Sequence, residues 1–123
     1  MGASNIPGEY VLPAVLHGFR EKYQGIAIAL TIADTKGIIE KVTANEIELG
    51  SVGATEKDSN LKFTKLTTDK LVLIAAADNP WFEQDVVTLE QLVEVPFVLR
   101  EIGSGTKSIL AIAFEWTPVS SIA

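Results

Sequence analysis

The sequence predicts an α/β fold in which helices cover a parallel or mixed sheet. Residues 26–33 (IAIALTIA) are apolar on both faces and partly β-branched, as in a strand that helices cover on two sides. A helical pattern follows this run, and residues 49–54 (LGSVGA) form another short apolar run. Strand, helix and strand joined by short links are the signature of a βαβ unit, in which the crossover is right-handed.

The first predicted helix follows a turn. Residues 2–8 are rich in Ser, Asn, Pro and Gly, which favours a turn. Apolar side chains then recur at helical spacing and form one stripe, which a Gln-Gly pair ends. Pro13 is tolerated only in the first turn of a helix, so we expect the regular helix to start near Leu12. The stripe consists of Leu12, Val15, Leu16, Phe19 and Tyr23.

The second predicted helix lies between the two apolar runs. Asp34 and Thr35 are of the residue types that accept hydrogen bonds from the first turn of a helix. The helix that they would cap carries the apolar residues Ile38, Ile39 and Val42, so we expect it to cover the sheet.

The second half of the sequence has a different pattern. Residues 61–66 and 70–77 are extended runs that predict strands. Thr88 together with Glu90 predicts the start of a short helix over residues 87–93. Further along the chain we expect a strand over residues 96–100 and a helix over residues 108–116, with no strong signal in residues 117–123.

The size and charge of the chain exclude several classes of protein. Its 123 residues correspond to one domain, and the absence of cysteine excludes disulfides, thiolate zinc sites and cysteine nucleophiles. A formal net charge of −6 disfavours direct binding of nucleic acid, which needs a basic face. No apolar run approaches the roughly 18 residues that span a bilayer. We see no secretory signal and therefore expect a cytoplasmic protein.

Two polar turns that contain glycine, at residues 2–5 and 103–106, each lead into a predicted helix. Free backbone N–H groups in the first turn of a helix attract anions, and Ser and Thr hydroxyls add donors. Both turns could also be simple helix caps, and the residues leave that alternative open. The second turn is not a phosphate-binding P-loop, because Lys107 follows Thr106 instead of preceding it.

No set of residues predicts catalysis or a metal site. His17 has no matched serine or carboxylate motif, so we expect a histidine on the surface or at a subunit interface. Scattered carboxylates are typical of solvated surface, and aromatic residues are typical of packing. We therefore expect no catalytic residue, metal or cofactor, and we disfavour an enzyme that acts on a phosphorylated substrate. The carboxylates are Glu46, Glu48, Glu56 and Asp58, and the aromatic residues are Trp81, Phe82 and Trp116.

Several segments, taken together, resemble a known family. They are residues 2–13 (GASNIPGEYVLP), 44–53 (ANEIELGSVG), 69–75 (DKLVLIA), 79–80 (NP) and 99–106 (LREIGSGT). In this order and spacing they are similar to the effector-binding domain of LysR-type transcriptional regulators, which has the type 2 periplasmic-binding-protein fold. The resemblance runs almost continuously from residue 2 to about residue 108.

The resemblance implies two α/β lobes with a small effector bound between them. Residues 1–76 would form the first lobe, with three layers and a mixed, mostly parallel sheet. Residues 77–123 would form an incomplete second lobe and a divergent tail. Two helix starts that face one cleft would favour a carboxylate, sulfate or phosphate as the effector. The ligand-binding residues that the resemblance implies are Ser4, Asn5, Ile6, Gly53, Ala54, Thr55, Ser104, Gly105 and Thr106.

The sequence also departs from the family pattern. The family's first strand is missing or reduced to residues 1–3, Ser51 stands where a large aliphatic residue is usual, and the likeness fails after about Lys107. Loss of the strands that return to the first lobe would leave a sheet edge and part of that lobe's apolar face uncovered, so we expect self-association. The helix-turn-helix of the family is absent, so we expect contact with DNA only through such a domain.

The residues and the resemblance leave two functions open. The first is an effector-sensing and oligomerisation domain of a LysR-type regulator, in which a bound ligand changes how the lobes close. The second is a truncated or engineered α/β fragment with no ligand function of its own. Saturable binding of an effector by this chain discriminates between the two.

Overall fold

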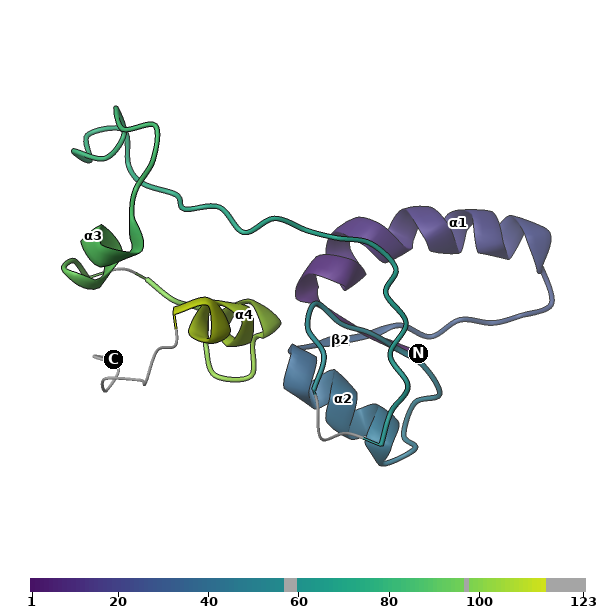
Figure 1. Cartoon of the computed structure of the whole chain (residues 1–123). Helices are drawn as coiled ribbons and strands as arrows, with labels where there is room; N and C mark the ends of the chain where they lie inside the picture. The colour runs from purple at the N-terminus through teal and green to yellow at the C-terminus, as the bar shows by residue number, and fades with distance from the viewer. Residues whose placement is uncertain (57–59, 97, 115–123) are drawn as a thin grey trace.

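The computed structural model describes residues 1–56, 60–96 and 98–114. Strands and helices alternate in the first half, whereas the described residues of the second half contain helices without strands (Figure 1). Most of the predicted ligand-binding residues lie in this first half of the chain.

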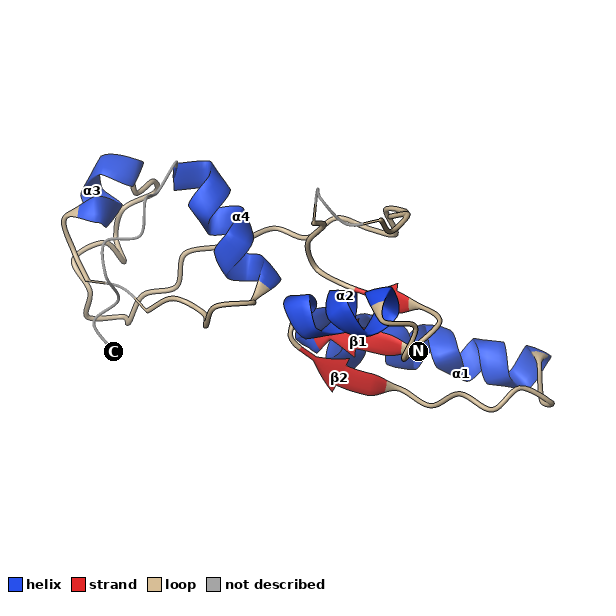
Figure 2. Ribbon diagram, turned by 90° about the horizontal axis from the view of Figure 1, so that it is seen from below, coloured by secondary structure: helices blue, strands red, loops and turns tan. Residues whose placement is uncertain are grey.

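Three short parallel strands form the sheet of the described residues, in the order β2-β1-β3 (Figure 2). The central strand β1 (Gly2–Ser4) lies between β2 (Thr31–Ala33) and β3 (Gly50–Ser51), with Ala3 opposite Ile32. The predicted α/β class is confirmed. All the described strand pairs are parallel, so the antiparallel part of a mixed sheet is not seen among them.

The first helical segment begins earlier than predicted. Residues 5–6 are already helical, and they lead through a π-helical stretch, η1 (Pro7–Val11), into α1 (Leu12–Lys22). The start of the regular helix at Leu12 is confirmed. The predicted turn over residues 2–8 is wrong, because its first three residues form β1 and the remainder is helical.

The π-helical stretch has a local cause. Pro13 has no N–H group and cannot donate a hydrogen bond to a carbonyl group in the preceding turn. The wide turn before it closes instead with the N–H of Leu12 on the carbonyl oxygen of Pro7. Gly8 lets this turn approach the sheet, since a Cβ built there would lie 3.2 Å from the Cβ of Ala3.

Helix α2 (Thr35–Thr43) covers the face of the sheet opposite α1, which gives the predicted three layers (Figure 1). The chain moves from β1 to β2 in one direction and from β2 to β3 in the other, so right-handed crossovers place the two helices on opposite faces. The apolar side of α2 faces the sheet, and Ile38 is fully buried. The predicted cap is confirmed: Asp34 Oδ1 accepts a hydrogen bond from the Gly37 N–H at 2.7 Å.

Two further helices form in the second half. Thr88 caps α3 (Leu89–Val93), as predicted, but its reciprocal partner is Gln91 and not Glu90. The Gln91 N–H donates to Thr88 Oγ1 at 3.4 Å, and the Thr88 N–H donates to Gln91 Oε1 at 2.8 Å. Helix α4 (Gly105–Phe114) begins before the predicted start at Ser108, and the predicted end at residue 116 lies outside the described residues.

The predicted strands are shorter than expected or absent. The strand expected over residues 26–33 is reduced to β2, and the one expected over residues 49–54 is reduced to β3. Residues 61–66, 70–77 and the described part of 96–100 form no strand. A strand needs a neighbour that pairs with its N–H and C=O groups, and the described chain places none beside these runs.

The buried apolar core is small. Residues 60–80 run from the part that contains the sheet towards the part that contains α3 (Figure 1). The division into lobes after residue 76 stays a prediction. None of the helices in the described part of the chain is long and apolar enough to cross a bilayer. The buried apolar side chains among the described residues are Ala3, Leu12, Ile38, Ile39 and Leu92.

Candidate functional site

Ser4 ties the ends of β1 and β3 together. It is the last residue of the central strand and is buried, with 6% of its surface exposed. Its Oγ accepts a hydrogen bond from the backbone N–H of Gly53, just past β3, at 3.1 Å. In an open α/β sheet, ligands bind at the carboxyl ends of neighbouring strands whose connections run in opposite directions. Ser4 and Gly53 lie at such a point between β1 and β3.

Asn5 joins the sheet to the second half of the chain. With its amide oriented to satisfy both neighbours, the nitrogen donates to the carbonyl oxygen of Ala33 at 3.2 Å, and the oxygen accepts from Arg100 Nη2 at 3.2 Å. Ala33 is the last residue of β2, so Asn5 links the carboxyl ends of two strands to Arg100. The next residue, Ile6, is exposed.

The turn before α4 packs against the start of α2. The Lys36 N–H donates to the carbonyl oxygen of Gly103 at 3.3 Å. Gly103 has a φ of +98°, and a Cβ built on it would collide with the Asp34 carboxylate. Both the backbone conformation and the close approach therefore require glycine at this position.

Helix α4 starts in contact with the same sheet edge. A Cβ built on Gly105 would lie 2.8 Å from Thr35 Oγ1 and 3.1 Å from the Cβ of Ala54. Ser104 is buried, with 5% of its surface exposed, and Thr106 is half-buried. Both polar turns that the sequence singled out therefore meet at the carboxyl edge of the sheet.

Arg100 and Glu101 bring paired charges to this edge. Arg100 Nε donates to Glu101 Oε2 at 2.8 Å, and Arg100 Nη2 donates to Glu101 Oε1 at 2.7 Å. These hydrogen bonds favour the ionised carboxylate and lower the pKa of Glu101 to about 2, with a further contribution from a hydrogen bond to the backbone of Glu101 itself. The same pairing raises the pKa of Arg100, and the nearby carboxylate of Glu9 adds to that effect.

The predicted ligand-binding residues fall into three groups. Five of them lie at the edge just described, where they contact one another or other residues of that edge: Ser4, Asn5, Gly53, Ala54 and Gly105. Ser104 and Thr106 are the neighbours of Gly105 in the chain. Ile6 and Thr55 are exposed.

Two residues at this edge, Thr35 and Arg100, were not predicted as ligand-binding residues. Thr35 is a buried polar residue at the start of α2, and the sequence had indicated only a cap there. Arg100 ends an expected strand, and this position next to a glycine turn is the signal that could have identified it.

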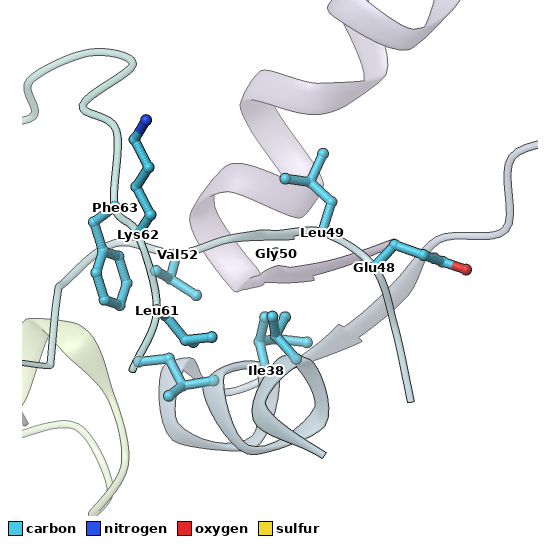
Figure 3. Close-up of a pocket in the computed structure, with 10 residues that line it drawn as sticks. Ile38, Glu48, Leu49, Gly50, Val52, Leu61, Lys62 and Phe63 are labelled. Atoms are coloured by element: carbon cyan, nitrogen blue, oxygen red, sulfur yellow. The ribbon is translucent and has the colours of Figure 1, made fainter. Parts of the chain in front are cut away.

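A cavity among the described residues is lined by other residues than those at this edge. It has a volume of about 260 Å³ and lies between α2, β3 and residues 61–63 (Figure 3). None of the predicted ligand-binding residues lines it, and its walls are mostly apolar. Its lining residues are Ile38, Ile39, Val42, Glu48, Leu49, Gly50, Val52, Leu61, Lys62 and Phe63.

The other candidates from the sequence lie on the surface or outside the described residues. His17 lies on an exposed face of α1, with its Nε2 3.6 Å from Glu21 Oε1. Glu46 pairs with Lys41 at 2.9 Å, as expected of a surface carboxylate. In the part of the chain that the structure describes, no group of three or more His, Asp or Glu residues could hold a metal ion. Asp58 and Trp116 lie outside the described residues, Trp81 is half-buried, and Glu48, Glu56 and Phe82 are exposed.

Comparison with known proteins gives a family match and several relatives. A family model described as the LysR substrate binding domain matches residues 1–120. The HTH-type transcriptional activator CmpR of Synechocystis sp. is 33% identical over 100 residues, which are 81% of this chain and 33% of that protein. The uncharacterized HTH-type transcriptional regulator YeiE of Escherichia coli is 32% identical over 108 residues, 88% of this chain and 36% of that protein.

A further relative is not named as a transcriptional regulator. The phosphonates import ATP-binding protein PhnC of Anaeromyxobacter dehalogenans is 35% identical over 112 residues, 89% of this chain and 22% of that protein. The chain thus spans between 22% and 36% of the length of these relatives. The family match continues past Lys107 to residue 120, so the family likeness extends further than the sequence reasoning placed it.

Proposed function

This chain belongs to the LysR substrate-binding domain family, and from that premise we propose that it senses a small anionic metabolite as part of a transcriptional regulator. The relatives CmpR and YeiE, which are named as a transcriptional activator and a transcriptional regulator, support the regulatory role. CmpR and YeiE are about three times as long as the segment that matches this chain. A regulatory role for this chain is therefore part of the proposal.

The observation that carries the proposal is the meeting of two helix starts at one edge of the sheet. The helical segment after β1 begins at Asn5, and α4 begins at Gly105. The free N–H groups of a first helical turn and the positive end of the helix dipole both attract anions. Arg100, which already reaches Asn5, would supply a guanidinium group suited to a carboxylate, sulfate or phosphate.

The hydroxyl groups at this edge fit the same role. Ser4 Oγ accepts a hydrogen bond from Gly53, which leaves its own O–H proton available for an anion. Thr106, in the first turn of α4, has a second hydroxyl group of this kind. We propose that these two side chains donate to the effector from opposite sides of the site.

Binding would act by shifting a conformational equilibrium. An anion held between residues 103–106 and the sheet edge would stabilise the arrangement in which the two halves of the chain meet. A ligand shifts such an equilibrium only by its difference in affinity for the two states. The resulting closure would change how associated subunits present their DNA-binding domains. We propose that DNA is contacted by a helix-turn-helix domain outside this sequence, and that the protein acts in the cytoplasm.

Titration calorimetry with sulfate, phosphate and small carboxylates tests the proposed site. We expect saturable binding to the 123-residue chain. Ser4→Ala and Thr106→Ala should each weaken binding by about tenfold, because a hydrogen bond to a charged group contributes about 1.5 kcal/mol. Thr64→Ala removes an exposed hydroxyl group far from this edge in the sequence and is expected to leave the affinity unchanged.

The same titration distinguishes the two functions that the sequence left open. Unchanged affinity in both Ser4→Ala and Thr106→Ala would remove the assigned site. If no anion binds saturably to the wild-type chain, the fragment without ligand function is the correct interpretation.

A further inference from the structure

Arg100 is the cation of the proposed effector site, and one side of its guanidinium group already holds a carboxylate. Its Nε–H donates to Glu101 Oε2 at 2.8 Å, and its Nη2 donates to Glu101 Oε1 at 2.7 Å. Two parallel hydrogen bonds of this kind are the arrangement in which arginine recognises carboxylates and phosphates. The Glu101 carboxylate therefore lies where an oxyanion from solution would make the same two contacts.

A separate contact fixes Arg100 beside the sheet. Arg100 Nη2 also donates to the amide oxygen of Asn5 at 3.2 Å, and the amide nitrogen of Asn5 donates to the carbonyl oxygen of Ala33 at 3.2 Å. Ala33 is the last residue of β2, so this chain of hydrogen bonds ends on the sheet. Because the bond to Asn5 does not involve Glu101, it would hold Arg100 at the carboxyl edge after Glu101 left.

The ion pair between Arg100 and Glu101 is open to solvent. The exposed fraction of the side chain is 41% for Arg100 and 53% for Glu101. Exposed ion pairs contribute little to stability, because water and dissolved ions screen them. An anion from solution can therefore replace Glu101 at much smaller cost than it could replace a partner in a buried pair.

Glu101 also belongs to the turn that leads into α4. The Ser104 N–H donates to the carbonyl oxygen of Glu101 at 3.3 Å. The backbone of Glu101 is thus part of the proposed site, while its carboxylate occupies the arginine of that site. Two anions at one guanidinium group repel each other, so an effector that binds this side of Arg100 must displace the carboxylate.

We propose that Glu101 competes with the effector for Arg100 and thereby sets the affinity of the site for anions. This inference rests on the proposed function, because it requires an effector that uses Arg100. In the empty site Glu101 neutralises the guanidinium group, and in the occupied site the effector takes its place while the carboxylate turns to solvent. The effector group that fits is an oxyanion with two oxygens for Nε–H and Nη2–H, as in a carboxylate, sulfate or phosphate.

Titration calorimetry with sulfate and with acetate, as separate probes, measures the competition. Glu101→Gln keeps the size of the side chain and removes its charge, so it should raise the affinity for both anions about fivefold. Glu9→Gln is the matched control. It removes another carboxylate near Arg100, one that forms no hydrogen bond with Arg100 in the described part of the chain. We expect it to change the affinity by less than about twofold.

The same substitution in a chain without Arg100 separates competition from a general effect of charge. In an Arg100→Gln background, Glu101→Gln should change the affinity no more than Glu9→Gln does, because the group for which Glu101 competes is gone. A fivefold gain in that background would overturn the proposal. A weaker affinity in Glu101→Gln alone would also overturn it, since Glu101 would then position Arg100 for the effector.

The titrations also separate this inference from the proposed function. If both anions bind the wild-type chain and Glu101→Gln leaves their affinities unchanged, the competition is wrong and the proposed function still holds. If neither anion binds the wild-type chain or Glu101→Gln, both are wrong.

NMR of the arginine side chains observes the competition directly. Arg20, the other arginine of the sequence, is exposed in the last turn of α1 and serves as the reference. Exchange of the Arg100 Nε–H with water should be slower in the wild-type chain than in Glu101→Gln, because Glu101 accepts that hydrogen bond. Saturating sulfate should slow the exchange in Glu101→Gln again. Equal exchange rates at Arg100 in the wild-type and Glu101→Gln chains would overturn the proposal.

Discussion

Single residues decide how the two halves of this chain meet. Asn5 contacts Ala33 and Arg100, and Gly105 packs against Thr35 and Ala54. The glycines at this edge allow the backbone to lie close to neighbouring atoms, whereas the polar side chains form hydrogen bonds with particular partners. A change at one such residue should therefore affect the junction more than an equal change elsewhere.

The titration of Glu101 is the first prediction at this scale. Arg100 holds the pKa of Glu101 at about 2, so the carboxylate should stay ionised until the pH approaches that value. A lowered pKa in the folded state means that this contribution to stability is complete above the ordinary value and is lost as the pH falls towards about 2. Arg100→Gln should raise the midpoint, measured by carbon NMR of the side chain, towards the ordinary value of 4.5, because the backbone hydrogen bond of Glu101 remains.

A matched change at another cation provides the control for this titration. Lys36→Gln removes a cation that pairs with Glu40 and should leave the Glu101 midpoint where it is. An unchanged Glu101 midpoint in Arg100→Gln would contradict the pairing.

Gly103 carries the second prediction at the residue scale. Its φ of +98° and its contact with Asp34 make any side chain strained, so Gly103→Ala should lower the free energy of unfolding by about 1–3 kcal/mol. Gly18→Ala is the control, because open space surrounds Gly18 in α1 and alanine should stabilise that helix by about 0.5–1 kcal/mol. Urea unfolding followed by circular dichroism measures both. Equal effects of the two substitutions would show that Gly103 is not constrained.

At the scale of elements, the sequence predicted helices better than strands. The caps at Asp34 and Thr88 and the start of α1 at Leu12 were correct, because they depend on residues a few positions apart. The strands predicted over residues 61–66 and 70–77 were wrong, although both runs have the composition of strands. A strand also depends on a partner that lies far away in the sequence.

The cap of α2 gives the prediction at this scale. Asp34 Oδ1 accepts from the Gly37 N–H at 2.7 Å, so Asp34→Ala should lower the free energy of unfolding by about 1 kcal/mol. Asp34→Asn keeps an acceptor in the same place and should lose much less. A loss in Asp34→Asn as large as that in Asp34→Ala would show that the charge, and not the cap, matters at this position.

At the scale of the whole molecule, a small core supports a large surface. Ile38 has no exposed surface, and it packs beneath β1 and β3, where a Cβ built on Gly50 would lie 2.8 Å from its side chain. Many large apolar side chains of the described residues are exposed, among them Val72 at 77% and Ile74 at 89%. Few buried side chains therefore hold the first half of the chain together.

Ile38→Ala tests this dependence. Removal of a fully buried isoleucine side chain costs about 2–5 kcal/mol, a large part of the 5–15 kcal/mol that stabilises an ordinary domain. We expect a largely unfolded chain in thermal melts followed by circular dichroism. Ile112→Ala, at a position that is 76% exposed in α4, should change the stability by less than about 0.5 kcal/mol. Similar melting of the two variants would contradict the assigned core.

The sequence by itself determined the helices, their caps, the α/β class and the family. Helices and caps follow from contacts within one or two turns, and the order of segments such as residues 2–13 and 99–106 carried the family likeness. Only the tertiary structure decided how far each strand extends, and only it brought Asn5 to Arg100 and Gly105 to Thr35. Those contacts join residues far apart in the chain, and local patterns cannot encode which distant partner a strand or a turn will meet.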